Sequence, residues 1–240
     1  MSRKKEPDIS ARATTGLLAG CAALLIAAVP GAGAAEPPRL YDSGPARGAG
    51  FIRIANVSNG IVSITPAGRA RIDLSAEDAL RVTRFEAITP GKIAASIRVG
   101  NQTRKLNVAI AANELVTVAI GVAANGSIAT TVFRETPKDF NALRSSLALF
   151  GVDKTCANAR LVADRNTVVI AGVAPGSLGR KAVNPVKVAL TVFCAKETRG
   201  LPAELGQLEA GERYSILIFA AQGAARRVLA LRDEMAVTRD

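Results

Sequence analysis

The alternation of apolar and polar residues along the chain predicts a series of short β-strands. Residues 50–57, "GFIRIANV", alternate in this way, and "SNG" at residues 58–60 then turns the chain into the apolar stretch "IVSITP". Turn residues separate further stretches of this kind, at residues 79–88, 92–99, 104–111, 114–122 and 127–135. Short strands divided by regularly spaced turns are typical of a β-sandwich.

The second half of the chain repeats the pattern of the first half. "AITPGKIAASIRV" begins at Ala87, and "AVNPVKVALTVF" begins 95 positions later at Ala182. "ANELVTVAIG" begins at Ala112 and "AGERYSILIF" 98 positions later at Ala210, and "TVFRE" and "LALRD" are also 98 positions apart. Matched stretches in one order at nearly constant spacing indicate a tandem duplication. We therefore predict an all-β protein of two tandem β-sandwich domains, at residues 40–135 and 143–235, joined by a linker at residues 136–142.

Each copy of the repeat has a proline and a lysine near the start of one predicted strand. Proline lacks an N–H and is tolerated at the first residue of a strand, so Pro90 and Pro185 are predicted to mark strand starts. Lys92 and Lys187 then fall on the polar side of the strand, and the residue after each falls on the apolar side. A structural reason therefore suffices for these prolines and lysines.

The N-terminal residues have the pattern of an export signal. Four basic residues precede the apolar run at residues 16–29, and the small residues "AGAA" follow at 32–35. We predict a signal peptide at residues 1–34 with cleavage after Ala34. Two alternatives stay open: the apolar run is an uncleaved anchor, or "LAGC" at residues 18–21 is a lipoprotein box whose Cys21 is acylated. Either alternative would attach the protein to a membrane.

The absence of histidine limits the chemistry that the chain can perform. None of the 240 residues is a histidine, which excludes Ser-His-Asp and Cys-His pairs, a histidine general base and histidine-containing metal sites. We therefore expect no catalytic residues, no metal site and no cofactor. An enzyme that uses lysine or carboxylates alone is the catalytic alternative that remains.

The chain is strongly basic, with a formal net charge of +11 at pH 7. Removal of residues 1–34 takes away four basic and two acidic side chains and leaves a charge of +9. A basic exported protein can bind an anionic polymer, lipid headgroups or an acidic protein. The basic residues are spread over both halves and form no stripe interleaved with aromatic residues, so nucleic acid is not an expected partner.

Two cysteines remain after removal of residues 1–34, Cys156 and Cys194. An oxidising compartment favours a disulfide between them. Closing that span of 38 positions would stabilise the fold by about 4 kcal/mol in the chain-entropy description. This pair is therefore the candidate disulfide of the second predicted domain.

Aromatic residues are scarce, at 4% of the chain. Proteins that bind sugars often stack the sugar rings on exposed aromatic faces. Four phenylalanines, at positions 51, 133, 193 and 219, lie within predicted strands and are expected in the cores. The candidates for stacking that remain are Tyr41, Phe85, Phe140, Phe150 and Tyr214. A flat aromatic platform is therefore poorly supplied, which favours a basic groove or a surface that faces a protein.

Three stretches resemble segments of the AlgF family, the accessory proteins of alginate O-acetylation. "LYDSGPARGAGFIRIANVSNG", residues 40–60, is similar to the start of mature AlgF, where a Leu-Tyr pair and a Gly-rich basic stretch precede a strand and an Asn turn. "AVNPVKVALTVF" and "AGERYSILIF" resemble the strand and a later segment of that family's second domain. The matching residues are Leu40, Tyr41, Phe51, Arg53, Asn56, Asn184, Pro185, Val186, Lys187, Val188, Gly211 and Glu212.

The resemblance implies a periplasmic protein that is required for O-acetylation of an exported polysaccharide without being the acetyltransferase. Its expected partners are periplasmic O-acetyltransferase proteins, which it would bridge, and the anionic polysaccharide itself. The chain departs from the family in its few aromatic residues and its cysteine pair, so the polymer need not be alginate. The alternative function is a periplasmic carbohydrate-binding module that holds the polymer through a basic surface.

Overall fold

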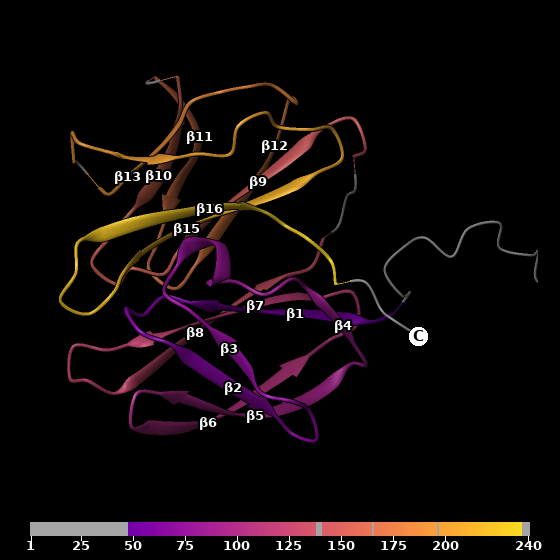
Figure 1. The fold of residues 1–240 in the computed structure, drawn as a ribbon. Coiled ribbons are helices and arrows are strands. Elements are labelled where there is room, and N and C mark those ends of the chain that lie inside the picture. The colour runs from indigo at the N-terminus through magenta and orange to yellow at the C-terminus, as the bar shows by residue number, and fades with distance from the viewer. Residues whose placement is uncertain (1–47, 138–140, 165, 196, 237–240) are drawn as a thin grey trace, which may run out of the picture. The chain divides into compact units, whose positions relative to one another are not determined.

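β-Strands form the regular structure of the chain. The computed structural model describes residues 48–137, 141–164, 166–195 and 197–236. Within these residues the elements are sixteen strands and one 3₁₀ turn, η1 (Asp78–Leu80), and no α-helix occurs among them (Figure 1). The prediction of an all-β fold is confirmed.

The first eight strands form a β-sandwich of two four-stranded sheets. One sheet has the strand order β4-β1-β7-β8 and the other the order β3-β2-β5-β6. Strands β1 and β7 run parallel, and the other neighbours run antiparallel. The strands are β1 (Gly50–Asn56), β2 (Val62–Pro66), β3 (Ile72–Leu74), β4 (Glu86–Ile88), β5 (Gly91–Val99), β6 (Gln102–Ile110), β7 (Leu115–Val122) and β8 (Ile128–Glu135).

The next eight strands form a second sandwich. Its sheets have the orders β12-β9-β15-β16 and β11-β10-β13-β14, and β9 and β15 are the parallel pair. The strands are β9 (Ser145–Gly151), β10 (Ala159–Ala163), β11 (Thr167–Val173), β12 (Leu178–Val183), β13 (Leu190–Phe193), β14 (Leu201–Ala203), β15 (Arg213–Ala220) and β16 (Arg226–Arg232).

The two sandwiches have the same topology and the same register. Adding eight to each strand number of the first sandwich gives the strand orders of the second. Phe51 lies opposite Leu115 in the pair β1–β7, and Ser146 lies opposite Arg213 in the pair β9–β15. These equivalent residues are 95 and 98 positions apart, which are the two offsets of the sequence repeat. The repeat in the sequence is therefore a repeat of the fold.

Each sandwich has its own apolar core between its two sheets. Successive side chains of a strand point to opposite faces, so every second residue enters the core. Ile54 of β1 and Ile97 of β5 belong to the first core, and their equivalents, Leu149 and Val192, belong to the second. The alternation in the sequence thus separates core residues from the residues on the other face of each sheet.

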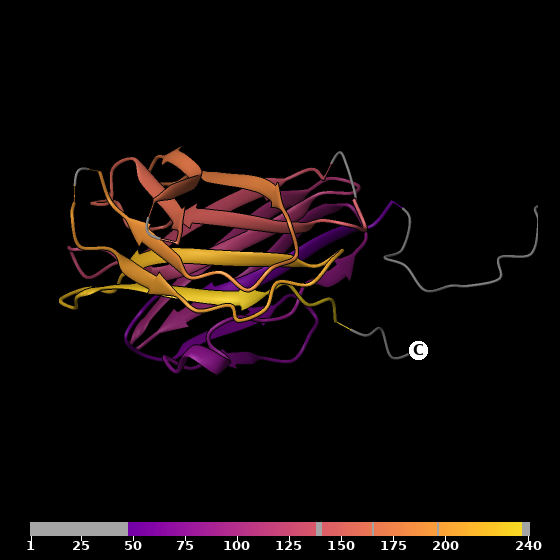
Figure 2. The same cartoon turned by 90° about the horizontal axis from the view of Figure 1, so that it is seen from above.

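The sheets that contain β1 and β9 contact each other through a third apolar cluster. Its members from the first sandwich include Ala119 and Phe133, and those from the second include Phe150, Leu217 and Phe219. The rings of Phe133 and Phe150 meet edge to face, with centroids 5.2 Å apart. Figures 1 and 2 show the yellow β15–β16 hairpin against strands of the first sandwich. The two cores are therefore joined by a further apolar layer.

One predicted strand is largely wrong. Residues 79–88 alternate like a strand, but they contain the end of η1, and only their last three residues form β4. The cause is Arg81, whose buried guanidinium donates to the carbonyl oxygens of Asn56 and Ser58, each at 2.9 Å. These bonds favour a turn at a place where the pattern of residue types predicts extended chain.

The strand predicted to begin at Pro185 begins later, at the first residue of β13. Pro185 lies in the connection from β12, and Lys187 forms an isolated bridge with Gln207. Pro90, by contrast, directly precedes β5, and Lys92 pairs within the continuous β5–β6 ladder. Both lysines are exposed, Lys92 on the outer face of β5 and Lys187 in the connection before β13.

Candidate functional site

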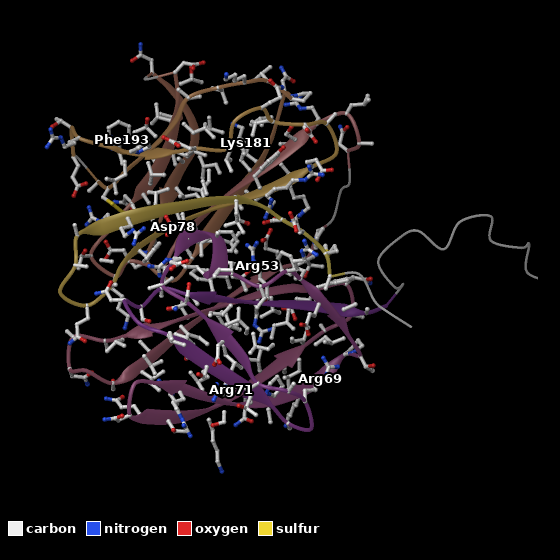
Figure 3. All side chains as sticks on the ribbon, viewed as in Figure 1. Arg53, Arg69, Arg71, Asp78, Lys181 and Phe193 are labelled. Atoms are coloured by element: carbon white, nitrogen blue, oxygen red, sulfur yellow. A yellow bond between two sulfur atoms is a disulfide. The ribbon has the colours of Figure 1, made fainter. Side chains whose placement is uncertain are left out.

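A buried arginine lies in the contact between the sandwiches. Arg53 of β1 is 1% exposed, and its three guanidinium nitrogens are all bound. Nε donates to Thr117 Oγ1 at 2.9 Å, Nη1 to Asp233 Oδ1 at 2.7 Å and Nη2 to Ser215 Oγ at 2.6 Å. Thr117 lies in β7 of the first sandwich. Ser215 lies in β15 and Asp233 directly follows β16, so both belong to the second sandwich. One guanidinium therefore links the two sandwiches (Figure 3).

Aromatic rings cover the guanidinium of Arg53. Its Cζ lies 4.4 Å from the ring centroid of Phe85 and 5.5 Å from that of Phe150. Attraction between a cation and a ring face partly replaces the water that the guanidinium loses on burial. Phe85, Phe150 and Tyr214 are all buried, so they are not the exposed stacking residues that the sequence offered as candidates, and Phe51 is buried beside Phe85.

A second set of ion pairs also joins the two sandwiches. Arg180 of β12 donates to both carboxylate oxygens of Glu135 at the end of β8, and Arg213 Nη2 lies 3.1 Å from the same group. Glu135 and Asp233 are 98 positions apart and so occupy equivalent places in the two sandwiches. Each sandwich therefore offers a carboxylate to an arginine of the other, in the pairs Arg53–Asp233 and Arg180–Glu135.

The carboxyl group of Asp233 is held in its charged form. Burial acts to raise its pKa, but the positive charges of Arg53 and Arg180 and the hydrogen bonds from Ser215 and Arg53 outweigh burial, so the pKa lies below the ordinary value. Burial and the nearby Arg180 lower the pKa of Arg213. Ser215 donates to Asp233 at 2.6 Å but is completely buried, out of reach of a substrate. We interpret this cluster as a contact that holds the sandwiches together.

The matched segments "ANEL" and "AGER" form the same turn before β7 and β15. Asn113 and Gly211 both have positive φ, at 60° and 78°, which glycine and asparagine adopt most readily. The glutamates that follow, Glu114 and Glu212, bind the arginine at the same place of the next strand, at 2.9 and 2.7 Å. Gly211 and Glu212, which match the AlgF pattern, thus have a structural role in a turn that occurs twice.

Asn56, another residue of the AlgF-like pattern, orders the turn between β1 and β2. Its buried Nδ2 donates to the carbonyl oxygens of Gly60, Leu74 and Ser75, at 2.8 to 3.0 Å. Its Oδ1 accepts from both the backbone and the hydroxyl of Ser58, each at 2.8 Å. The side chain of Asn56 therefore makes hydrogen bonds to backbone groups of the turn that would otherwise need backbone partners.

The "NPVKV" stretch lies at the surface of the second sandwich. Asn184, Pro185, Val186 and Lys187 are exposed, and Val188 is half-buried against the second core. Backbone bonds of Val186 and Lys187 join the stretch to residues 207 and 208, before β15.

A disulfide joins Cys156 and Cys194 in the second core. The two Cα atoms are 5.0 Å apart, and the cysteines flank β10 and β13, which pair with each other. Both residues are buried. The bond therefore ties neighbouring strands of the outer sheet and has no exposed sulfur for chemistry.

Besides a groove of about 460 Å³ whose lining includes Arg53 and Arg84, two further grooves are found in the described part of the molecule. One, of about 720 Å³, lies between the sandwiches and is lined by residues of β7, β8 and the turns after β7, β9 and β15, many of them alanine, together with Asp153, Lys154 and Thr155. The other, of about 330 Å³, opens between the sheets of the first sandwich and is lined by isoleucines, with Lys92 and the 3.4 Å ion pair of Arg69 and Glu86 among its lining. Within the described ranges, no group of three potential metal ligands is close enough together to hold a metal ion.

The outer surface of the sheet β3-β2-β5-β6 combines three cations with small polar side chains. These residues alternate with core residues such as Ile64 of β2 and Ile97 of β5. We name the following residues the cationic face: Ser63, Thr65, Lys92, Ser96, Arg98, Thr103, Lys105 and Asn107.

Strand register places the side chains of the cationic face next to one another. Arg98 lies between Ser63 and Thr103, and Ser96 lies between Thr65 and Lys105. Among the ion pairs of the described residues, none includes a cation of this face. The neighbouring carboxylate on β3, at position 73, is bound by the arginine at position 71 at 2.8 Å (Figure 3 labels Arg71). The three cations are therefore available to a ligand.

The corresponding face of the second sandwich differs. Register puts Phe193 at the position of Arg98 and Pro202 at that of Lys105. The guanidinium of Arg160 stacks on Phe193, with Cζ 4.7 Å from the ring centroid (Figure 3 labels Phe193). The outer faces of the two sandwiches have thus become different, while the inner faces still complement each other.

Sequence reasoning missed the cationic face, because the basic residues of the chain look evenly spread. The available signal is parity: Lys92 and Arg98 lie an even number of residues apart in one predicted strand. Lys105 reaches the same face only because Gly100 and Asn101 close the hairpin in the observed register. Parity and register together, and not local charge density, identify the face.

Some predictions concern residues outside those that the structure describes. They are the signal peptide with its cleavage after Ala34, acylation of Cys21, the AlgF-like Leu40 and Tyr41, and Phe140. The predicted linker at residues 136–142 lies in the interval between β8 and β9 and is only partly described. In the described part of the chain no helix is long and apolar enough to span a membrane.

Comparison with known proteins assigns no family to the chain. No family profile and no curated protein match the sequence. One similar solved structure is described as a "putative cell adhesion protein" from Bacteroides uniformis; it is 11% identical, with 79% of this chain and 100% of that chain covered and a TM-score of 0.29. Another, of the same description, comes from Bacteroides ovatus; it is 12% identical, with 80% and 100% covered and a TM-score of 0.25.

Proposed function

We propose that the protein is a non-enzymatic periplasmic adaptor that is required for O-acetylation of an exported polysaccharide and bridges proteins of the acetylation machinery. The observation that carries this proposal is the joining of two sandwiches, through buried ion pairs and an apolar layer, with two different outer faces. An adaptor needs two distinct surfaces held in one body. Duplication followed by divergence of the outer faces supplies such surfaces.

Sequence features support the same function. The chain lacks histidine, which agrees with a protein that leaves the transfer of acetyl groups to other proteins. The AlgF-like stretches resemble an accessory protein of that process, and in the structure Asn56, Gly211 and Glu212 order turns of the sandwiches. These residues therefore support the resemblance through the fold and leave the surfaces to determine the partners.

Deletion of the gene tests the proposal. We expect the exported polysaccharide to lose its acetyl esters while its yield stays the same, and the wild-type gene to restore the esters. Acetyl content is measured by ester hydrolysis of the purified polymer. Unchanged acetylation in the deletion strain would overturn the proposal, and loss of the polymer itself would place the protein in synthesis or export instead.

A second candidate function is a periplasmic carbohydrate-binding module that holds the polymer through a basic surface. The observation that favours it is the cationic face, whose three cations lack ion pairs within the described residues. The two functions are compatible, because an adaptor that also holds the polymer brings the substrate to the acetyltransferase proteins. The amount of polymer that the cells of the deletion strain retain, measured separately from the acetyl content of the polymer, distinguishes the two functions.

A further inference from the structure

We infer that the cationic face binds a linear anionic polysaccharide whose sugars bear carboxylates, lying extended across β5 and β6. This inference rests on the proposed function, since it assumes that the protein handles an exported polymer, and it adds the ligand class and the residues. It starts from the three cations on one surface of a sheet, Lys92, Arg98 and Lys105.

The spacing of the cations suits a repeating ligand. Lys92 and Arg98 are six residues apart on one strand, which corresponds to about 20 Å at the rise of a β-strand. Lys105 lies diagonally across from Arg98 on the next strand, at about 7 to 8 Å between Cα atoms. A single small anion cannot contact cations that far apart, whereas a polymer with a carboxylate on successive sugars can contact all three at once.

Small side chains, the polar ones of the cationic face together with Ala94 and Ala109, lie between the cations. Hydroxyl groups both donate and accept hydrogen bonds, and the amide of Asn107 does so through separate atoms, which matches the hydroxyl groups of a sugar. The hydroxyls of Thr65 and Ser96 lie beside Lys105, and those of Ser63 and Thr103 flank Arg98, so hydroxyl groups neighbour two of the cations. The face can therefore bind the hydroxyls and the carboxylates of one polymer together.

Other classes of anionic partner fit this surface less well. The cationic face contains no aromatic ring on which a nucleic acid base could stack, and no large apolar side chain that could anchor a protein or enter a membrane. Ile61, which directly precedes β2 and has the parity of Ser63, is exposed at the margin of the face. Charge and hydroxyl groups, without apolar anchors, point to a hydrophilic polymer.

The test is a binding titration with sodium alginate, a linear polymer of uronic acids, at about 50 mM and about 300 mM NaCl. The variant Lys92→Gln/Arg98→Gln/Lys105→Gln removes the three cations. The control variant Lys181→Gln/Lys187→Gln/Arg199→Gln removes three exposed cations from the second sandwich and so changes the net charge equally. Circular dichroism and thermal melting confirm that both variants fold.

We expect wild-type binding at low salt that weakens at high salt, a loss of about tenfold or more in the first variant and less than about threefold in the control. Neutral dextran should not bind. Absence of binding at low salt, or an equal loss in the two variants, would overturn the inference. Equal affinity for polyglutamate or for phosphatidylglycerol vesicles would also overturn it, because the face would then not select a polysaccharide.

The outcome stays separate from that of the deletion experiment. If the first variant no longer binds alginate but restores full acetylation in the deletion strain, the adaptor function stands and polymer binding is not part of it. If alginate binds at the cationic face but the deletion leaves acetylation unchanged, the face is supported and the adaptor function is wrong.

Discussion

Replacement of Arg53 by methionine should strongly destabilise the protein. Methionine keeps an unbranched side chain of similar reach but removes the guanidinium, and with it the 2.7 Å ion pair to Asp233. The aspartate side chain is 1% exposed, so its charge would stay buried after its main partner is gone. Removing one partner of a buried ion pair typically costs about 3 to 5 kcal/mol.

Two features of the site reduce this cost. Asp233 keeps its hydrogen bond from Ser215 at 2.6 Å and an ion pair with Arg180 at 3.4 Å. Arg213 Nε also lies within 3.9 Å of the carboxylate. We therefore expect the Arg53→Met variant to lose about 3 kcal/mol, at the lower end of that range. At about 2 to 4 °C per kcal/mol for a chain of this size, the melting temperature should fall by about 6 to 12 °C.

Urea unfolding followed by circular dichroism measures this loss. Arg69→Met is a matched control, because Arg69 is 62% exposed and its pair with Glu86 is 3.4 Å long at the surface. A surface pair contributes about 1 kcal/mol or less, so this control should change little. If Arg53→Met costs no more than Arg69→Met, the buried ion pair does not stabilise the contact and our reading of the cluster is refuted.

The same site makes stability depend on pH. The pKa of Asp233 in the folded protein lies below its value of about 3.9 in the unfolded chain. Its contribution is therefore fully present above about pH 4 and is lost as the pH falls through the folded pKa. The stability advantage of wild type over Asp233→Asn should shrink below pH 4 in the same unfolding assay, and an advantage that stays constant down to pH 2 would contradict this.

Three further predictions concern other parts of the fold. Replacing Cys156 and Cys194 by alanine should lower the free energy of unfolding by about 3 to 4 kcal/mol. The wild-type protein, unfolded by urea in the presence of a reducing agent, should have the same urea midpoint as this variant. Burial acts to raise the pKa of Asp153, but hydrogen bonds from Arg226 and Thr155 and the charge of Arg226 outweigh burial and lower it. The Asp153→Asn variant should therefore lose stability at pH 7 and progressively less below about pH 4. In Gly151→Ala the new Cβ would lie 2.6 Å from a backbone oxygen and should cost about 1 to 3 kcal/mol, whereas Gly60→Ala, with no atom within 4 Å, should cost less than about 1 kcal/mol; equal melting temperatures would contradict this.

The alternation of residue types predicted most of the fold, because burial of one strand face is a local property. The repeat predicted that two units share a topology, since equivalent positions must pack in the same way. Residues 79–88 fail because Arg81 turns the chain through bonds to carbonyl oxygens of another segment. No local pattern encodes such a partner.

The sites depend on contacts between distant residues and were harder to predict. Arg53 looks like one polar residue of an alternating strand, and its partner Asp233 lies 180 positions away. The face of β1 that carries Arg53 becomes buried because the sheet that contains β9 packs against it. The cationic face likewise becomes visible only after the register of β5 and β6 is known.

The reciprocal pairs Arg53–Asp233 and Arg180–Glu135 have a consequence for how the two halves can change over time. The two carboxylates occupy equivalent positions, but the arginines do not, because Arg53 corresponds to Ala148 and Arg180 corresponds to Phe85, so the two halves have also diverged within their contact. In a dimer of two identical subunits, by contrast, the same residues face each other from both sides. In such a dimer every substitution appears on both subunits at once. In a fused chain each half accumulates substitutions independently, both in the contact and on its outer face, so one gene can present Arg98 on one outer face and Phe193 at the equivalent position of the other.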